Sequence, residues 1–501
     1  MKVRLNSNMK NSNILHSSWL YAVATLVPAL LGMLSISIFT RIFNAYEFGE
    51  YSLALNTSVF LSTLLVQWIQ QSTQKYRPIY TRENKIDEFN GNLLKVLSQV
   101  SGVFLVVAVI SYMVLKGFIS IGSYYFPVVF LVVSNIFFLS FSTVLQSDFK
   151  VSRFKNISVL TSFFKLVLPL ILLMTLTKSP TMILIGTAIV QFLFVANIYF
   201  KDLKPATLKK QNYDNYKSFK MKFIQFGLPM VGWFIANSII TLSDRYMLQI
   251  FADDRQVGIY SANYSLIIAG IGLLTRPILS VAHPELMNMQ YETKEEKKRI
   301  ELRNQSFTQW YFILTIPIFF FLLSYSINLV NIFLGQQFHE GYKILPVLYL
   351  SLLVWNAGLF GHKGFEILSK TKVMMMLVVC SAIINVILNL LVIPKYGYLG
   401  AAYASLLSMM TYPVSVYFLS KKNIPWKINF LSVIKTIIAG LVSFKVAYLI
   451  TSSIRNDFIQ LFLGVSIGTI LYLILMILIK GITVPNAYEK RVRLWLNFLK
   501  S

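Results

Sequence analysis

Residues 385–404 read NVILNLLVIPKYGYLGAAYA. Apolar residues fill the sequence on both sides of Ile393-Pro-Lys-Tyr-Gly397, a segment that contains proline and glycine, the residues that most often end helices. The flanking runs, residues 371–393 and 398–420, are each long enough to cross about 30 Å of hydrocarbon as a helix. We therefore expect two membrane helices joined by a short turn.

The rest of the chain repeats this pattern. Of the 501 residues, 56% are hydrophobic and only 13% are charged, which is too apolar for soluble domains. The runs are long and apolar on every face, which excludes the ten-residue alternating strands of an outer-membrane barrel. We predict an all-α membrane protein with about fourteen transmembrane helices. The predicted spans lie near residues 17–40, 50–70, 93–116, 118–146, 155–176, 180–200, 223–250, 257–282, 307–334, 343–369, 371–393, 398–420, 430–452 and 457–480.

The number of lysine and arginine residues alternates between high and low in successive loops. This alternation predicts the orientation of the chain in the membrane. Several basic residues occur in each of residues 2–10, 75–85, 150–155, 201–222, 294–303, 370–372, 421–427 and 490–500. The intervening loops hold one each: Arg41, Lys116, Lys178, Arg255, Lys343, Lys395 and Arg455. Because basic residues concentrate in cytoplasmic loops, both termini are predicted to be cytoplasmic. This topology accounts for the net charge of +26, and the absence of any nucleic-acid-binding motif excludes nucleic acid as a partner.

A weak internal repeat predicts the domain organisation. Phe48-Gly-Glu-Tyr-Ser52 follows the first span, and Val257-Gly-Ile-Tyr-Ser261 follows the seventh. Pro28 and Pro229 also occur early in the corresponding helices. This repeat is typical of a transporter with two six-helix lobes and two appended helices. The predicted parts are an N-terminal lobe (1–200), a basic cytoplasmic linker (201–222), a C-terminal lobe (223–420), and two further helices with a basic tail (421–501).

Several segments together carry a resemblance to a known family. They are Arg41–Ser52, Phe226-Gly-Leu-Pro229, Ser243-Asp-Arg-Tyr-Met247, Val257–Ser261, Pro284 and Asn385–Ala404. In order and spacing, from about residue 15 to 420, the chain resembles the polysaccharide biosynthesis transporters. These are the repeat-unit (Wzx-like) flippases of the multidrug/oligosaccharidyl-lipid/polysaccharide exporter superfamily.

The resemblance implies a function and partners. The protein would carry polyprenyl-diphosphate-linked oligosaccharide repeat units across the bacterial plasma membrane by alternating access, for O-antigen, capsule or exopolysaccharide synthesis. It would be a multi-pass membrane protein in contact with lipid and would not be an enzyme. A polysaccharide polymerase and its chain-length machinery are the expected protein partners.

Charged residues inside the spans are the candidate functional residues, because each costs about 2.5–3.5 kcal/mol to insert at the bilayer centre. Five cations are candidates for binding the diphosphate in a central cavity: Lys165, Arg245, Arg276, Arg41 and Lys363. Asp244 and Glu366 are candidates for coupling transport to H⁺ or Na⁺. A structural charge pair remains an alternative for Asp244 and Arg245, and snorkelling toward the cytoplasm remains one for Lys363. We expect no cofactor, metal centre or catalytic residue, and a single cysteine, Cys380, excludes a cysteine-bound metal cluster.

Three other functions remain as alternatives. A lipid-linked peptidoglycan precursor flippase would share the helix number and the cationic cavity. A drug or cation antiporter of the same superfamily should prefer acidic cavity residues. A membrane glycan polymerase or transferase should have a large outer loop or a carboxylate-rich cytoplasmic site, and the sequence contains neither.

Overall fold

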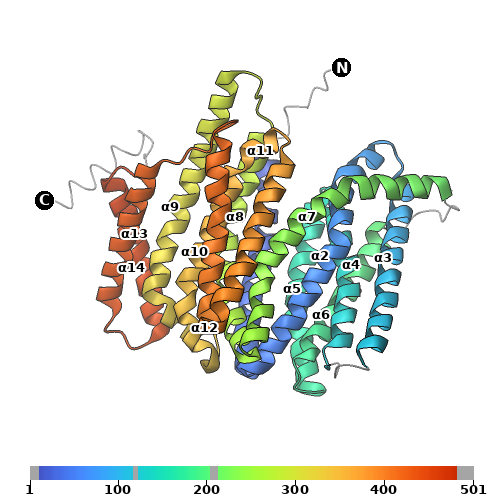
Figure 1. The fold of residues 1–501 in the computed structure, drawn as a ribbon, viewed down its shortest axis with the longest axis horizontal. Helices are drawn as coiled ribbons and strands as arrows, with labels where there is room; N and C mark the ends of the chain where they lie inside the picture. Colours follow the sequence, from blue (N-terminus) through green and yellow to red (C-terminus); the bar gives the residue numbers. More distant parts are fainter. Residues whose placement is uncertain (1–10, 117–121, 204–212, 482–501) are drawn as a thin grey trace. The chain divides into compact units, whose positions relative to one another are not determined.

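The computed structural model describes residues 11–116, 122–203 and 213–481, and within these ranges every regular element is helical (Figure 1). Both predicted basic ends and residues 204–212 of the predicted linker lie outside the described residues. The elements are α1 (Asn11–Ile42), α2 (Ala45–Arg82), α3 (Ile86–Leu115), α4 (Tyr125–Ser147), α5 (Val151–Thr175), α6 (Thr181–Ile198), the π-helix η1 (Tyr199–Leu203), α7 (Tyr213–Phe251), α8 (Asp254–Met287), α9 (Lys294–Phe333), the 3₁₀-helix η2 (Gln336–Ile344), α10 (Leu345–Gly361), α11 (Lys363–Ile367), α12 (Thr371–Ser420), α13 (Phe430–Thr451) and α14 (Asp457–Leu478).

The predicted all-α membrane class is confirmed. Eleven described helices are long and apolar enough to cross a membrane, and the number rises to thirteen if bent α7 and bent α8 each count as one span. Several helices are longer than predicted: α2 covers residues 45–82 against a predicted 50–70. Hydropathy detects only the apolar middle of such a helix, whereas the helix itself continues through polar residues beyond it. The number fourteen and the orientation stay predictions.

α12 contains the turn predicted from residues 393–397. Its only non-helical residue is Gly397, with φ +54° and ψ −135°, and a predicted span lies on each side of it. The Gln256 side-chain oxygen accepts a hydrogen bond from the Tyr398 backbone N–H at 3.0 Å. A Cβ on Gly397 would lie 1.9 Å from that oxygen. Glycine is therefore required at this position both by its backbone angle and by the lack of space.

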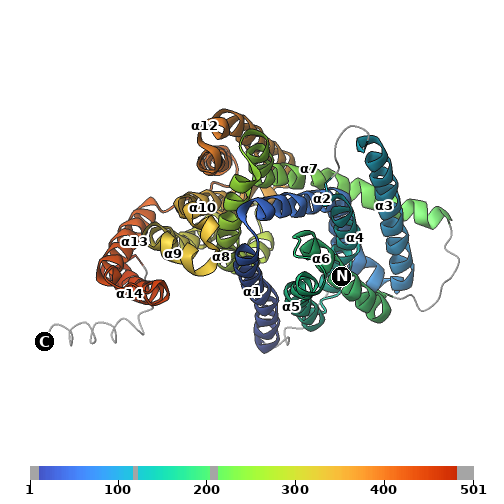
Figure 2. The ribbon, with the colours of Figure 1, turned by 90° about the horizontal axis from the view of Figure 1, so that it is seen from below.

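The chain divides into two compact units. The first unit contains Met1–Ala269 and Met374–Ala404, and the second contains Gly270–Val373 and Ser405–Ser501. In the second unit, α9, α13 and α14 lie side by side (Figures 1 and 2). A Cβ on Gly464 of α14 would lie 2.2 Å from the Tyr325 ring of α9, so α14 approaches α9 closely. The Tyr325 hydroxyl also hydrogen-bonds to Thr451 of α13 at 2.8 Å. The two predicted six-helix lobes stay a prediction.

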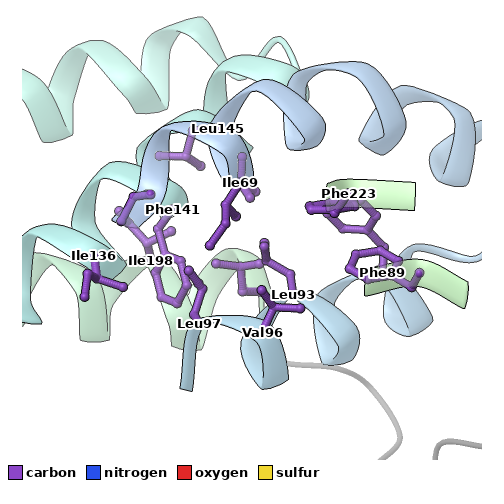
Figure 3. Packing of buried hydrophobic residues seen from close by; sticks show 14 of the residues in the cluster. Ile69, Phe89, Leu93, Val96, Leu97, Ile136, Phe141, Leu145, Ile198 and Phe223 are labelled. Carbon is purple, nitrogen blue, oxygen red and sulfur yellow. The ribbon is translucent and has the colours of Figure 1, made fainter. Parts of the chain in front are cut away.

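The core of the first unit is an aromatic and aliphatic cluster formed by α2, α3, α4, α5, α6, η1 and α7 (Figure 3). The first turns of α7 place Tyr216, Phe219 and Phe223 in this cluster, at the spacing of one helix face. Lys217 and Lys222 of the same segment are exposed. Residues 213–222, predicted as part of a linker, therefore form an amphipathic helix. Gly227 allows this helix to cross α2, because a Cβ there would lie 2.2 Å from the Trp68 carbonyl oxygen.

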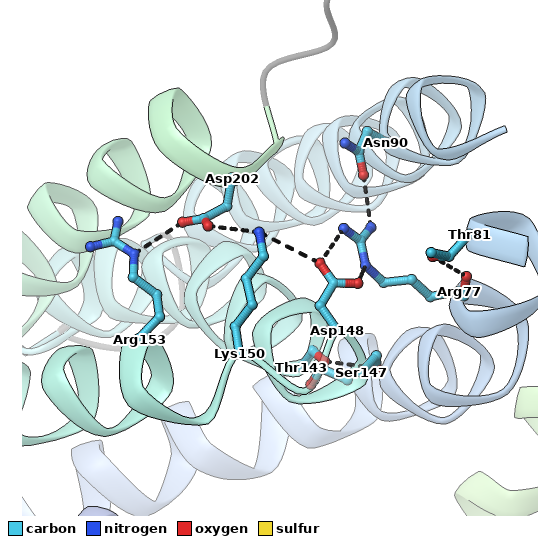
Figure 4. A network of polar contacts seen from close by, with 9 residues as sticks. All are labelled: Arg77, Thr81, Asn90, Thr143, Ser147, Asp148, Lys150, Arg153 and Asp202. Carbon is cyan, nitrogen blue, oxygen red and sulfur yellow. Dashed lines mark hydrogen bonds and ion pairs between the residues drawn. The ribbon is translucent and has the colours of Figure 1, made fainter. Parts of the chain in front are cut away.

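A buried ion-pair network joins helix ends in the first unit (Figure 4). Arg77 of α2 is 1% exposed and donates to both Asp148 carboxylate oxygens at 2.6 and 2.8 Å, and also to Asn90 of α3 at 2.7 Å. Lys150 lies 3.8 Å from Asp148 and 3.0 Å from Asp202. Arg153 also pairs with Asp202, at 3.2 Å. These basic residues, predicted to lie in cytoplasmic loops, therefore also hold α2, α3, α5 and η1 together.

We predict that Asp148→Leu destabilises the protein by about 3–5 kcal/mol, because it leaves the Arg77 guanidinium buried without its carboxylate. The measurement is thermal unfolding of the purified full-length protein in detergent. The double variant Arg77→Met/Asp148→Leu should regain most of that stability. Glu83→Ala removes an exposed pair with Lys85 and serves as the control, with an expected change of about 0–1 kcal/mol. Equal destabilisation by the single and double variants would contradict the prediction.

Candidate substrate cavity and buried charges

The predicted coupling residue Asp244 is buried in α7, with 1% of its surface exposed. One carboxylate oxygen accepts a hydrogen bond from the Tyr260 hydroxyl of α8 at 2.5 Å. The other accepts from the Asn389 side-chain amide of α12 at 2.7 Å. Asp244 therefore links three helices of the first unit.

Asn385 and Asn389 complete this network from α12. The Ser243 hydroxyl donates to the Asn385 oxygen at 2.6 Å, and the Asn389 amide donates to the same oxygen at 3.2 Å. The Asn389 oxygen is buried and has no hydrogen-bond partner in the described part of the chain. The network thus joins α7 to α12 and leaves one amide oxygen free to accept a further hydrogen bond or a cation.

Arg245, the next residue on α7, points toward other partners. Its Nε donates to the Ser261 hydroxyl at 3.2 Å, and Nη1 donates to the Thr241 carbonyl oxygen at 2.5 Å. The guanidinium lies 4.5 Å from the centre of the Tyr264 ring, within the range of a cation–π interaction. Arg245 is only 4% exposed, and its guanidinium is oriented by neutral groups.

Arg245 lines a cavity of about 270 Å³ among α1, α2, α7 and α8 of the first unit. Its polar lining comes from short hydroxyl and amide side chains, and the remainder is mostly aromatic and aliphatic. The polar residues are Ser35, Ser52, Asn56, Arg245 and Ser265. The guanidinium is the only charged group in this described lining, so the cavity is suited to an anion.

Two other predicted cavity cations of the first unit do not line this cavity. Lys165 is half-buried on α5, with its Nζ 5.1 Å from the centre of the Phe138 ring of α4. No carboxylate of the described residues forms an ion pair with it. Arg41 is exposed at the end of α1 and donates to the Ser37 carbonyl oxygen at 2.8 Å. The structure therefore separates Lys165, Arg41 and Arg245.

Lys363 and Glu366 lie together in the second unit. The Lys363 Nζ is 2.6 Å from a Glu366 carboxylate oxygen and 2.9 Å from His283 Nδ1. His362 Nε2 contacts the other Glu366 oxygen at 3.0 Å, and His362 Nδ1 lies 2.7 Å from the Tyr412 hydroxyl. Because Lys363 is only 5% exposed, it is a buried ion-pair partner and does not snorkel to the surface.

Arg276 also belongs to the second unit, and its side chain is exposed. It follows the bend of 44° between Asp254–Gly272 and Thr275–Met287 of α8. Pro277, a residue type that often kinks helices, lies immediately beyond this bend.

Tyr260, Tyr264 and Arg77 were not predicted as partners of buried charges. Tyr260 belongs to the repeated Gly-x-Tyr-Ser segment, which by its sequence predicts only a turn. Asp148 and Asp202 are two of the few carboxylates in otherwise basic segments. Such rare carboxylates could have indicated that a basic residue such as Arg77 forms an ion pair in this region.

Comparison with solved structures shows the fold. The lipid II flippase MurJ, in an inward closed conformation, has 19% sequence identity, with a TM-score of 0.74 over 92% of this chain and 99% of that chain. The MATE multidrug transporter DinF-BH has 16% identity and a TM-score of 0.61 over 84% of this chain and 98% of that chain. The fold is therefore shared with flippases and exporters.

Sequence comparison identifies the family. A Haloferax volcanii protein named as a probable low-salt glycan biosynthesis flippase, Agl15, is 25% identical over 58% of this chain and 60% of its own length. A Shigella flexneri protein named as an O-antigen transporter is 26% identical over 37% of this chain and 43% of its own length. The chain thus spans less than two thirds of each relative. These relatives are transporters and not enzymes, as expected. Residues 14–290, more than half of the chain, match the family described as polysaccharide biosynthesis protein, and the chain belongs to that family.

Proposed function

We propose that this protein is a flippase that moves polyprenyl-diphosphate-linked oligosaccharide repeat units across a bacterial plasma membrane. The observation that carries the proposal is the buried Arg245 lining a polar cavity, in a chain that belongs to the polysaccharide biosynthesis protein family. A guanidinium presents two parallel N–H donors that match phosphate oxygens. The groups that accept its hydrogen bonds, the Ser261 hydroxyl and the Thr241 carbonyl oxygen, are neutral.

The 270 Å³ cavity is too small for a whole oligosaccharide, so we assign it to the charged head of the substrate alone. Ser35, Ser52 and Asn56 would supply further hydrogen bonds there. Lys165 and Arg276 remain proposed cationic contacts at other stages of transport, and Arg41 remains one near the end of α1. Lys363 has a weaker claim because Glu366 already neutralises it.

Alternating access is supported by the contact between the two repeated glycines. A Cβ on Gly49 of α2 would lie 1.9 Å from the Asp254 carbonyl oxygen, and one on Gly258 of α8 would lie 2.0 Å from the Ala45 carbonyl oxygen. The two members of the internal repeat thus touch each other, backbone to backbone. We propose that this crossing closes one side of the membrane and separates when the protein changes state.

Coupling to an ion is proposed at one of two carboxylates. Asp244 accepts a hydrogen bond from the Asn389 amide nitrogen, and the Asn389 oxygen is buried without a hydrogen-bond partner in the described residues, so the same network contains carboxylate and amide oxygens, the ligand type that Na⁺ also uses. Glu366 contacts two histidines and a lysine, a group suited to proton exchange. We favour Asp244, because it is in direct contact with α8 and α12 and adjoins Arg245.

We predict that Arg245→Ala lowers surface glycan at least about tenfold, since a charge-assisted hydrogen bond contributes about 1.5–3 kcal/mol. Arg245→Lys should keep partial activity because it retains the charge but loses the paired donors. Surface glycan and membrane abundance are measured together in cells that carry each variant as the only copy. Arg82→Ala, an exposed arginine at the end of α2, is the control. Normal glycan in Arg245→Ala would eliminate the assigned role.

Lys165→Ala and Arg276→Ala test the remaining cations of the proposal in the same assay. We expect reduced glycan at normal abundance, since no described carboxylate is stranded by either change. Lys165→Glu should abolish transport, because a negative charge would repel the diphosphate. If both Ala variants produce normal glycan, binding is confined to Arg245.

We predict that Gly258→Ala strongly reduces transport, because its Cβ would force α8 away from the Ala45 carbonyl oxygen. Gly102→Ala is the matched control, since nothing lies within 4 Å of a Cβ at that position. Spin labels on α2 and α8 would report the change in the distance between the two helices. A Gly258→Ala protein with wild-type transport and wild-type distances would remove this crossing from the transport cycle.

We predict that phosphatase fusions after Lys298 are inactive and fusions after Lys178 are active, since the first segment is basic and the second holds one lysine. Immunoblots for fusion abundance provide the control. Activity after Lys298 would reverse the proposed orientation of the chain.

A further inference from the structure

The first half of α7 packs across its neighbours in the first unit. This half, Asn215–Pro229, bends by 44° from the rest of the helix. It crosses α2 and reaches α3 (Figures 1 and 2). Phe219 and Phe223 fix it in the core, and the Ser72 hydroxyl of α2 donates to the Phe223 carbonyl oxygen at 2.8 Å. This packing determines which face of the half-helix is left uncovered.

The uncovered face has an open groove of about 460 Å³. All of its described lining residues belong to α7 and are exposed: Lys217, Ser218, Met221, Lys222 and Gln225. The groove therefore contains two cations and no carboxylate in this lining.

Lysines from the two neighbouring helices lie against the same half of α7. The Lys75 Nζ of α2 lies 3.8 Å from the centre of the Phe226 ring. The Lys95 Nζ of α3 lies 4.1 Å from the centre of the Tyr216 ring. Both distances are within the range of a cation–π interaction, so α7 holds these two lysines beside its own.

Lys220 of α7 is tied to α3 as well. Its Nζ donates to the Gln99 side-chain oxygen at 3.1 Å, and the Tyr216 hydroxyl donates to the same oxygen at 2.5 Å. The three helices thus gather five lysines, which we call the basic face: Lys75, Lys95, Lys217, Lys220 and Lys222. No carboxylate of the described residues forms an ion pair with any of them, whereas Lys150 and Arg153 of the same unit are paired (Figure 4). The basic face therefore carries positive charge that the described chain does not neutralise.

Apolar side chains are exposed on the same half of α7. Met221 is 48% exposed and Leu228 is 55% exposed, and their spacing of seven residues places them on one side of the helix. Leu228 is also only three residues before Val231–Phe251, the half of α7 that continues as a membrane span. Lysine beside exposed apolar residues, at the entry to a span, is typical of a helix at the bilayer surface.

We propose that the basic face binds an anionic phospholipid, with the lipid phosphate at Lys217 and Lys222 and the acyl chains beside Met221 and Leu228. Lysines near a membrane surface attract anionic headgroups, and the apolar side chains favour a lipid over a soluble anion. This interaction is separate from glycan transport, because the basic face shares no residue with the lining of the cavity that contains Arg245.

The test measures which lipids lie next to the groove. A fluorophore is attached to Ser218→Cys in a Cys380→Ser background, which contains no other cysteine. The full-length protein is placed in phosphatidylcholine nanodiscs that contain a small fraction of spin-labelled phosphatidylglycerol or of spin-labelled phosphatidylcholine. At equal mole fraction, the anionic lipid should quench the fluorophore at least about threefold more strongly, and high salt should reduce this difference.

The double variant Lys217→Gln/Lys222→Gln should remove the preference for the anionic lipid. Lys294→Gln/Lys298→Gln, which changes two exposed lysines of α9, is the charge-matched control and should retain the preference. Thermal unfolding at the wild-type temperature shows that each variant is folded. Loss of the preference only in the α7 variant supports the proposal.

Four results would overturn it. Equal quenching by both lipids in the protein with native lysines would show that the site does not select anionic lipid. Loss of the preference in the control variant would show that net charge alone is responsible. Absence of quenching by either lipid would show that the groove faces solution or a soluble partner. Removal of the preference by millimolar inorganic phosphate would identify a soluble anion as the ligand.

Discussion

A fully buried charged side chain among these helices is stabilised by partners within the protein, because hydrocarbon supplies none. This constraint organises both units. Arg77 binds Asp148 across helix ends, Lys363 binds Glu366, and Asp244 accepts hydrogen bonds from two neighbouring helices. Breaking any of these would leave a buried charge at a cost of several kcal/mol, so they fix which helices are neighbours. Arg245 differs because the groups that accept its hydrogen bonds, on Ser261 and Thr241, are neutral. A buried guanidinium whose hydrogen bonds go to neutral groups is an arrangement suited to binding an anion.

Close backbone contact is the second constraint, and it depends on glycine. Gly49 and Gly258 allow α2 and α8 to touch, and Gly227 allows α7 to cross α2. At each crossing the absence of a side chain brings backbones together without interlocking side chains. Such a contact is tight in one arrangement and easily separated in another, since few side chains must repack. The internal repeat therefore has a physical meaning: its two glycines bring the backbones of α2 and α8 into contact.

Much of the fold could be predicted from the sequence, because a bilayer imposes a fixed length on apolar segments. The helix break at Gly397 was predicted from Ile393-Pro-Lys-Tyr-Gly397, since proline and glycine act locally. The helix ends were wrong by up to twelve residues in α2, because polar residues continue a helix beyond the hydrocarbon. The site was predictable only in part. Asp244 and Arg245 were recognised as costly charges, but their partners Tyr260 and Asn389 could not be, since these contacts join residues far apart in the sequence. The neutralisation of Lys363 by Glu366 depends on rotamers, which spacing alone does not determine.

Two cavities of the first unit, the one lined by Arg245 and one of about 520 Å³ that contains Glu50, share α2 as a wall. Tyr51, Ser52 and Asn56 face the cavity lined by Arg245, whereas Glu50, Ala54 and Thr57 face the cavity that contains Glu50. Opposite faces of one helix therefore line two cavities whose single charged residues in the described linings, Arg245 and Glu50, are opposite in sign. Because α2 also touches α8 at Gly49, a tilt of α2 about that contact would enlarge one cavity at the expense of the other.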